Sequence, residues 1–200
     1  MQKHNIKKYF VPNFNKTLNK INMDSINKNQ PEDNFENLIG KDALEKIKEL
    51  AAKSGGCFFC TKITSGQAFS TRPMAPEKID DAGNLWFLSA SDSHKNKEIE
   101  EDPAVQLLFQ GSSYSNFLTL YGKATISRDK EKIKELWDPT MKTWFTEGQE
   151  DPRITVLKVT PTEGYYWDTK HGMAVATVKR LFGAAVGQTY DDSIEGEVKL

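Results

Sequence analysis

The sequence has few cysteines and histidines, the residues that most often hold a small fold together through disulfides or metals. Its 200 residues include two cysteines and three histidines, and His4, His94 and His171 show no metal-ligand spacing. A chain of this length can bury an adequate core without such help. We therefore expect an ordinary globular fold with no metal site.

The sequence also has no excess of one charge and no long apolar run. Its 27 basic and 28 acidic residues give a net charge of −1 and a pI near 6.3, which does not favour a nucleic acid or an anionic membrane as partner. No stretch approaches the roughly 18 apolar residues of a membrane-spanning helix, and the N-terminus lacks the apolar centre of a secretory signal. We expect a cytoplasmic protein with a small-molecule ligand.

The two cysteines fall in one motif, Gly-Gly-Cys-Phe-Phe-Cys at residues 55–60. A redox CxxC opens a helix whose N-terminus lowers the thiol pKa, whereas this motif is apolar and continues into Thr-Lys-Ile-Thr, which is typical of a strand. Residues three apart on a strand face opposite sides and lie roughly 10 Å apart, farther than a disulfide spans. Cys57 and Cys60 are therefore interpreted as strand residues, not as a redox or zinc pair.

The first 40 residues differ in composition from the rest of the chain. Residues 1–22 contain five lysines and no acidic residue, and Met23 opens a second plausible start. A basic arm for nucleic acid is one interpretation; the favoured one is a disordered tail or an extension upstream of the true initiator. Residues 24–40 are polar and are predicted to form a linker.

From residue 41 the pattern becomes that of a folded domain. Apolar residues at helical spacing before Ser54-Gly55-Gly56 predict a helix. Strand-like segments follow at 57–63, 68–74, 85–90, 105–110, 117–127, 153–160 and 164–167, with helices from Ser93 to Pro103, at 129–137 and at 141–145, and a hairpin turn at 80–84 joining the second and third strands. This order predicts a mainly β fold with flanking helices over 41–170, a closed or nearly closed antiparallel barrel. Residues 171–200 are expected to pack on the barrel or on a partner chain.

One stretch of the sequence carries candidate binding chemistry. The predicted strand 85–90 leads into a turn and a helix start with Ser93, His94, Lys95 and Lys97. A helix N-terminus attracts anions through its free N–H groups, and nearby ammonium and hydroxyl donors strengthen that preference. The stretch is therefore a candidate phosphate cradle. The alternative is that Ser93 is only a helix cap and the lysines only a solvated face.

Two further segments could contribute to the same site. Arg72 ends a predicted strand beside Pro73, where its planar guanidinium suits phosphate oxygens and the fixed backbone suits a flat ring. Residues 164–168 are Gly-Tyr-Tyr-Trp-Asp, and one of these aromatics either covers a ring system or packs in the core.

Taken in order, these segments resemble a known family. The motifs are Ser-Thr-Arg-Pro-Met (70–74), Leu-Trp-Phe-Leu-Ser (85–89), Ser-His-Lys (93–95), Asp-Pro-Ala-Val-Gln-Leu-Leu-Phe (102–109), Tyr-Gly-Lys-Ala (121–124), Val-Thr-Pro (159–161) and Tyr-Trp (166–167). The set covers roughly residues 41–170 and resembles the pyridoxamine-5′-phosphate-oxidase-like FMN-binding split barrels. Within these it looks most like the bacterial general stress proteins.

The resemblance implies an antiparallel, Greek-key-like split β-barrel that forms a homodimer with FMN at the subunit interface. His94 stands where the family has an arginine, and Asn116 stands beside the position of a flavin-contacting glutamine. The flavin contacts implied by position are Arg72, Pro73, Met74, Ala75, Leu88, Ser89, Ser93, His94, Lys95, Asn116 and Trp167.

The resemblance does not fix the reaction. The chain lacks the C-terminal Arg-x-His segment that true pyridoxamine phosphate oxidases share, and no general base or nucleophile stands out. The resemblance therefore favours an FMN-dependent oxidoreductase of unknown substrate. The alternatives are a pyridoxamine or pyridoxine phosphate oxidase, a non-enzymatic flavin store, or a barrel that binds FAD, a deazaflavin or haem.

Overall fold

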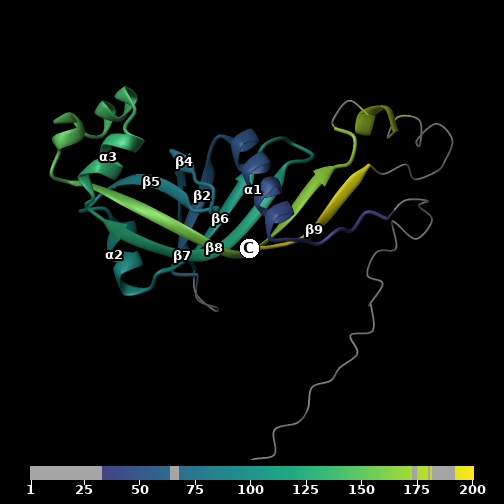
Figure 1. The fold of residues 1–200 in the computed structure, drawn as a ribbon, viewed down its shortest axis with the longest axis horizontal. Helices are drawn as coiled ribbons and strands as arrows, with labels where there is room; N and C mark the ends of the chain where they lie inside the picture. Colours follow the sequence, from purple (N-terminus) through teal and green to yellow (C-terminus); the bar gives the residue numbers. More distant parts are fainter. Residues whose placement is uncertain (1–32, 64–67, 173–174, 180, 182–191) are drawn as a thin grey trace, which may run out of the picture.

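The computed structural model describes residues 33–63, 68–172, 175–179, 181 and 192–200. Within these ranges, nine strands form one sheet (Figure 1). The strands are β1 (Leu38–Ile39), β2 (Cys57–Thr61), β3 (Ser70–Met74), β4 (Lys78–Ile79), β5 (Leu85–Ala90), β6 (Ala104–Gln110), β7 (Phe117–Ser127), β8 (Ile154–Thr169) and β9 (Ser193–Lys199).

The sheet follows the order β1-β9-β8-β7-β6-β2-β3, and β5 pairs with both β8 and β4. The named strands of the described residues pair antiparallel, except β1 with β9, which is parallel. β3 and β5 do not pair, so the barrel is split and not closed. The predicted mainly β fold with flanking helices is thereby confirmed.

Helix α1 (Lys41–Ser54) covers the inner face of the sheet. Ala43, Ile47, Leu50 and Ala51 recur at helical spacing and are buried. Gly55 ends the helix in the left-handed region, with φ 66°, and its N–H donates to the Ala51 carbonyl at 3.2 Å. The helix predicted before the Ser-Gly-Gly segment is confirmed.

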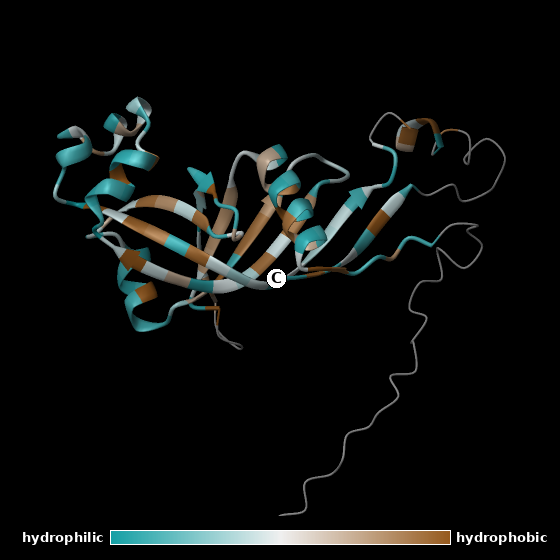
Figure 2. Cartoon of the chain, in the orientation of Figure 1, coloured by the Kyte–Doolittle hydropathy of each residue, from teal (hydrophilic) through white to brown (hydrophobic). Residues whose placement is uncertain are grey.

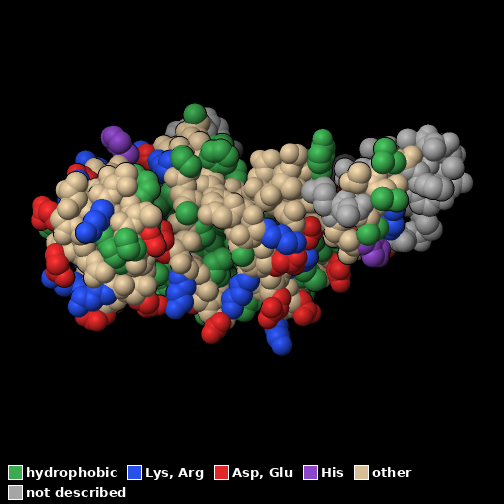
Figure 3. Space-filling model, turned by 90° about the horizontal axis from the view of Figure 1, so that it is seen from above, with side chains coloured by type: hydrophobic (Ala, Val, Ile, Leu, Met, Phe, Trp, Pro, Cys, Tyr) green, Lys and Arg blue, Asp and Glu red, His purple; other side chains and the backbone are tan. Residues whose placement is uncertain are grey.

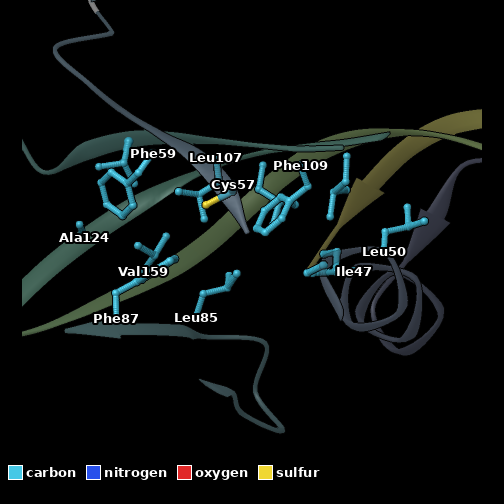
Figure 4. Close-up of a cluster of buried hydrophobic side chains, with 14 of the residues drawn as sticks. Ile47, Leu50, Cys57, Phe59, Leu85, Phe87, Leu107, Phe109, Ala124 and Val159 are labelled. Atoms are coloured by element: carbon cyan, nitrogen blue, oxygen red, sulfur yellow. The ribbon is translucent and has the colours of Figure 1, made fainter. Parts of the chain in front are cut away.

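The main core lies between α1, the central strands and β5. Figure 4 shows Ile47 and Leu50 of α1 beside side chains from the strands. Phe59 of β2 and Phe87 of β5 meet edge to face, with ring centroids 5.4 Å apart, and neither is exposed. Each fully buried side chain of this size contributes about 1.5–3 kcal/mol. This core holds β5 near β2 although the two strands share no hydrogen bonds.

A second apolar cluster lies on the other face of β5. Helix α3 (Lys130–Leu136) contributes Ile133 and Leu136, which pack against Leu88 and Ile154. The 3₁₀ turns η2 (Pro139–Thr143) and η3 (Gly148–Glu150) follow α3. Figures 1 and 2 show α3 with a largely polar outer surface, and α2 on the opposite side of the strands. The two faces of β5 are therefore committed to different neighbours.

Strand β8 differs from the sequence prediction of two strands separated around Pro161. It is continuous over 16 residues and pairs along its length with β7. The register shifts between Tyr121 and Gly122, and Gly122 opposes Pro161. The bulge accommodates the proline because Gly122 has no side chain to clash with the Thr160 carbonyl. Pro161 therefore coincides with a shift in the register between β7 and β8 but does not end β8.

Three other sequence expectations need correction. The turn at 80–84 joins β5 to the short strand β4, whereas β3 pairs with β2. The sheet begins before residue 41, since β1 pairs with β9 and the predicted linker therefore includes strand residues. Residues 193–199 form β9 beside β8, so the C-terminal extension supplies a strand of the sheet. Residues 1–32 and most of the apolar segment 174–186 lie outside the described residues.

Both cysteines are free and buried, as expected for strand residues. Cys57 opposes Met74 and Cys60 opposes Thr71, which places the two thiols on opposite faces of β2. Burial, with a smaller effect from Cys60, raises the pKa of Cys57 to about 12. A thiol with this pKa stays protonated and unreactive at neutral pH.

Candidate functional site

The candidate site is built around the start of helix α2 (His94–Glu101), which follows β5 directly. Ser93 is the N-cap, with an extended backbone, and its Oγ accepts a hydrogen bond from the Asn96 N–H at 3.4 Å. The predicted cap is confirmed. The first N–H groups of a helix have no partner within the helix, so this turn presents donors to an anion.

A buried polar network fixes the helix start on β5 and β8. Asn96 Oδ1 accepts hydrogen bonds from Ser89 Oγ at 2.7 Å and Ser93 Oγ at 3.1 Å. Asn96 Nδ2 donates to Thr155 Oγ1 at 2.8 Å, and Thr155 Oγ1 donates to the Ser89 carbonyl at 2.9 Å. Leaving one of these buried groups unpaired costs about 1–3 kcal/mol. Ser89 is 2% exposed, so its hydroxyl supports the turn from within.

A second network joins α2 to the edge strand β3. Glu98 accepts hydrogen bonds from Thr61 Oγ1 at 2.5 Å, Arg72 Nη2 at 2.8 Å and Ser70 Oγ at 2.9 Å. Arg72 Nη1 also donates to Thr61 Oγ1 at 2.7 Å. Burial acts to raise the pKa of Glu98, but these hydrogen bonds and the charge of Arg72 outweigh it and lower the pKa to about 2. The network therefore spans the split in the barrel, because it links β3 to the helix that follows β5.

Lys95 is a cation with no acidic partner among the described residues. Its side chain is half-buried, and its Nζ donates to Ser93 Oγ at 3.4 Å. Burial, and after it the charge of Arg72, lowers the pKa of Lys95. A half-buried ammonium close to a guanidinium and a helix N-terminus has the charge and the donors that suit an anion.

Two neighbouring predicted residues are placed differently. His94 is exposed at the first position of α2. The Leu88 side chain is buried in the α3 cluster, on the opposite face from Ser89. The Leu88 backbone, unlike its side chain, faces the edge of β5 on which β4 lies. The Glu77 N–H bonds to the Trp86 carbonyl on that edge, and the backbone groups of Leu88, two residues later, point the same way. β4 covers only Leu85 and Trp86 of that edge, so the Leu88 backbone can still approach a ligand.

The predicted residues of β3 divide between the two faces of the sheet. Arg72 opposes the buried Phe59, and Met74 packs against the main core. Pro73 lies on the outer face and is exposed, as is Ala75 after the strand. A ligand at the edge of β3 could contact residues of both faces. A ligand on one face alone would contact either Arg72 and Met74 or Pro73 and Ala75.

Asn116 and Trp167 lie far from Lys95 within one chain. Trp167 opposes Phe117 beside the β6–β7 turn, where Asn116 has φ 60° and its Oδ1 accepts from Lys53 Nζ at 3.2 Å. Trp167 lies twelve positions after Thr155 on β8, which is about 40 Å along the strand at 3.3 Å per residue. One chain therefore does not bring all the predicted residues together.

The outer face of the central sheet is rich in apolar and aromatic side chains. Pro73, Phe58, Leu108, Thr119 and Tyr165 lie opposite one another in a single row across five strands. Phe58 is 53% exposed and Trp167, in the adjacent row, is 43% exposed. We call this surface the outer apolar face, defined by Phe58, Pro73, Leu108, Tyr121, Tyr165 and Trp167.

The sequence analysis did not assign a site role to five residues that build the site: Thr61, Ser70, Asn96, Glu98 and Thr155. A partial signal exists, because Lys95 and Glu98 are three apart on a helix and so lie on neighbouring positions of one face. Nothing in the sequence links Thr61 or Thr155 to α2, since both depend on strand register.

Three cavities among the described residues lie apart from the candidate site. Cavities of about 480, 620 and 570 Å³ are lined by residues other than the eleven predicted contacts. The described residues hold no cluster of side chains suited to a metal and no helix with the length and hydropathy to cross a bilayer. Figure 3 shows acidic and basic side chains intermingled on one face of the molecule.

Comparisons with known proteins agree with this architecture. The sequence model for the family described as pyridoxamine 5′-phosphate oxidase like matches residues 42–191. Protein bli-3 of Neurospora crassa is 26% identical over 105 residues, which are 48% of this chain and 50% of bli-3. The chain therefore spans about half the length of this curated relative.

Two solved structures with a similar fold come from the bacteria Jannaschia sp. CCS1 and Xanthomonas citri. A protein assigned as general stress protein 26 from Jannaschia sp. CCS1 is 25% identical, with a TM-score of 0.67 over 80% of this chain and 100% of that chain. The general stress FMN/FAD binding protein of Xanthomonas citri is 20% identical, with a TM-score of 0.50 over 60% of this chain and 84% of that chain, a likeness of fold alone. Since the family match covers well over half of the sequence, the chain belongs to the pyridoxamine 5′-phosphate oxidase like family.

Proposed function

We propose that this chain is a flavoprotein of the general-stress type that holds FMN between two copies of itself and acts as an oxidoreductase on a substrate still to be identified. The observation that carries the proposal is Lys95, a half-buried ammonium beside Arg72 that has no carboxylate partner among the described residues. Two cations at a helix N-terminus match the charge and the oxygen acceptors of a phosphate monoester. The description of the Xanthomonas citri relative as an FMN/FAD binding protein supports the choice of ligand.

The proposal that two chains share each site rests on the separation of the predicted contacts. Lys95 and Trp167 lie at opposite ends of β8, so a single flavin cannot reach both within one chain. A second copy placed with its strands reversed would bring the Asn116 and Trp167 end beside the first copy's Lys95. The outer apolar face gives such a pair a surface to bury.

In this proposal a bound flavin supplies hydride transfer, and the residues of the chain bind and orient it. Lys95 and the first turn of α2 hold the phosphate, and Arg72 adds a directed hydrogen-bond donor. The exposed backbone edge of β5 at Leu88 offers an N–H and a carbonyl to the polar rim of a flat ring. FAD carries a phosphate at the same point of its ribityl chain, so the same residues would accept it.

Replacing both cations tests the proposal directly. Charge-assisted hydrogen bonds contribute about 1.5–3 kcal/mol each, so the double variant Arg72→Ala, Lys95→Ala should lower FMN affinity at least about 100-fold. Fluorescence titration of flavin-free protein measures this loss. Lys134→Ala is the matched control, because Lys134 is an exposed lysine of α3, outside the candidate phosphate cradle. A double variant that purifies as yellow as the parent contradicts the assigned site.

The same preparation separates the candidate activities. Anaerobic reduction of the bound flavin by NADH or NADPH supports an oxidoreductase, whereas a flavin that neither nucleotide nor common acceptors alter supports a storage protein. Oxygen uptake with pyridoxine phosphate would instead identify a pyridoxine phosphate oxidase. A colourless protein that ignores added flavin would reject all three.

A further inference from the structure

Glu98 occupies an unusual position for a carboxylate beside a candidate anion site. Its side chain is 12% exposed, and it lies on the same helix as Lys95, one turn later. A negative charge this close to a bound phosphate weakens binding through Coulomb repulsion. A purely electrostatic anion site would therefore have no use for Glu98.

The hydrogen bonds of Glu98 suggest a different role. Thr61, Ser70 and Arg72 all donate to its carboxylate, and all three come from the β2–β3 hairpin, across the split from α2. Arg72 is held at two points, since Nη1 bonds to Thr61 and Nη2 bonds to Glu98. A guanidinium has five N–H donors, so these two hydrogen bonds leave other donors of Arg72 for a ligand.

Arg72 needs hydrogen bonds that fix its side chain because of where it lies. Among the described strands, β3 has a neighbour on one edge only, and the Arg72 side chain is 23% exposed. Lys95 precedes Glu98 by one turn of α2, and Arg72 bonds to Glu98 at 2.8 Å, so the two positive charges lie close enough to repel. Without a carboxylate to balance it, the guanidinium would move toward solvent and away from Lys95, because long side chains at a sheet edge lose considerable rotamer entropy when they are ordered.

We propose that Glu98 is a positioning residue, which holds the Arg72 guanidinium beside Lys95 so that both cations contact one phosphate group. This inference rests on the proposed function and deepens it. Glu98 touches no ligand in this scheme and acts through Arg72. The rigid hydroxyl donors Thr61 and Ser70 keep the carboxylate itself in place.

The sign of a mutational effect separates positioning from electrostatics. Glu98→Gln removes the negative charge, so an electrostatic role predicts tighter FMN binding. Glu98→Asp keeps the charge but shortens the side chain by one methylene group, so an electrostatic role predicts no change. Positioning predicts that both variants bind FMN at least about tenfold more weakly, because glutamine keeps one acceptor oxygen but loses the charge that holds Arg72, and aspartate is too short to reach it. Glu100→Gln is the matched control, since Glu100 is an exposed glutamate of the same helix.

Riboflavin serves as the second ligand in the experiment because it lacks the phosphate. Each variant is titrated with FMN and with riboflavin, and the affinity ratio isolates the phosphate contribution. A fall in FMN affinity with riboflavin affinity changed less than twofold supports the inference. Equal weakening of both ligands would show that Glu98 only maintains the fold, and tighter FMN binding by Glu98→Gln would show that it competes for Arg72; either result overturns the inference.

Failure of the proposed function gives a distinct pattern. If the parent protein binds neither flavin, the flavin proposal falls, and the same variants are titrated with pyrophosphate as the anion. Weaker pyrophosphate binding by both Glu98 variants still supports positioning. Unchanged or tighter binding overturns it.

Discussion

At the scale of single residues, the site depends on how its charges are balanced. Arg72 is paired with Glu98, whereas Lys95 has only a hydroxyl partner among the described residues. A cation that is partly desolvated and unpaired raises the free energy of the ligand-free chain, and an anion that neutralises it recovers that cost on binding. The neighbouring residues therefore have to hold the unpaired Lys95 ammonium in a position that is unfavourable without a ligand.

The pKa of Glu98 leads to a prediction about acid stability. Its folded-state pKa of about 2 lies below the ordinary value of 4.5, so the charged carboxylate stabilises the folded chain fully above pH 4.5. This stabilisation is lost as the pH falls from 4.5 toward 2, by up to about 1.4 kcal/mol per pH unit.

Urea unfolding at several pH values between 6 and 3 measures the effect. The slope of unfolding free energy against pH below 4.5 should be smaller in Glu98→Gln than in the parent, because the variant has no proton to bind at this position. Glu100→Gln should keep the parental slope. Parallel slopes for the parent and Glu98→Gln would show that Glu98 ionises alike in the folded and unfolded chains.

At the scale of elements, β8 organises the molecule. It pairs with β7 along one edge, and with β5 and then β9 along the other. The bulge at Pro161 lies between the β5 and β9 segments, so one strand serves two parts of the sheet. This arrangement fixes the distance between the Lys95 end and the Trp167 end of the chain.

Gly164 is a point in β8 where the sheet has no room for a side chain. A Cβ there would collide with the Thr119 carbonyl and approach the Leu120 side chain to 2.8 Å. Gly164→Ala should therefore destabilise the fold by about 1–3 kcal/mol. Urea unfolding monitored by circular dichroism gives the value.

Gly56→Ala is the control for this substitution. A Cβ at Gly56 would meet the Met74 carbonyl at 3.5 Å, an ordinary contact. A Gly164→Ala variant as stable as the parent would mean that β7 and β8 adjust their spacing freely, and the close approach would then carry no energetic weight.

At the scale of the whole molecule, the outer apolar face is the surface that the proposed dimer would bury. Phe58 lies on β2, next to Pro73 in the row that crosses this face, and is 53% exposed in one chain. Phe58→Asp should convert a dimer into monomers and lower FMN retention, because placing an unpaired charge in an apolar interface is strongly unfavourable. Light scattering coupled to gel filtration measures the mass.

Ile39→Asp provides the comparison for that experiment. Ile39 is 72% exposed on β1, at the opposite margin of the sheet from β3, and its substitution should leave the dimer intact. A parent protein that is monomeric yet binds FMN tightly would reject the shared site. Retention of the dimer by Phe58→Asp would place the interface elsewhere on the molecule.

The sequence alone determined several of the elements and the part of the site chemistry that is local in the chain. Helix α1, strands β5 and β7 and the cap at Ser93 follow from periodicity and from turn residues, because these signals act between residues close in the chain. The family resemblance likewise rests on the order of local motifs.

Only the tertiary structure decided which residues meet. Register between distant segments decides four features that the sequence did not predict. These are the partners of Glu98, the path of β8 through Pro161, the pairing of β4 with β5, and the addition of β1 and β9 to the sheet. Register is fixed by packing against a shared core, and no single segment encodes it. The distance between Lys95 and Trp167 has the same origin, since it is set by the length of one unbroken strand.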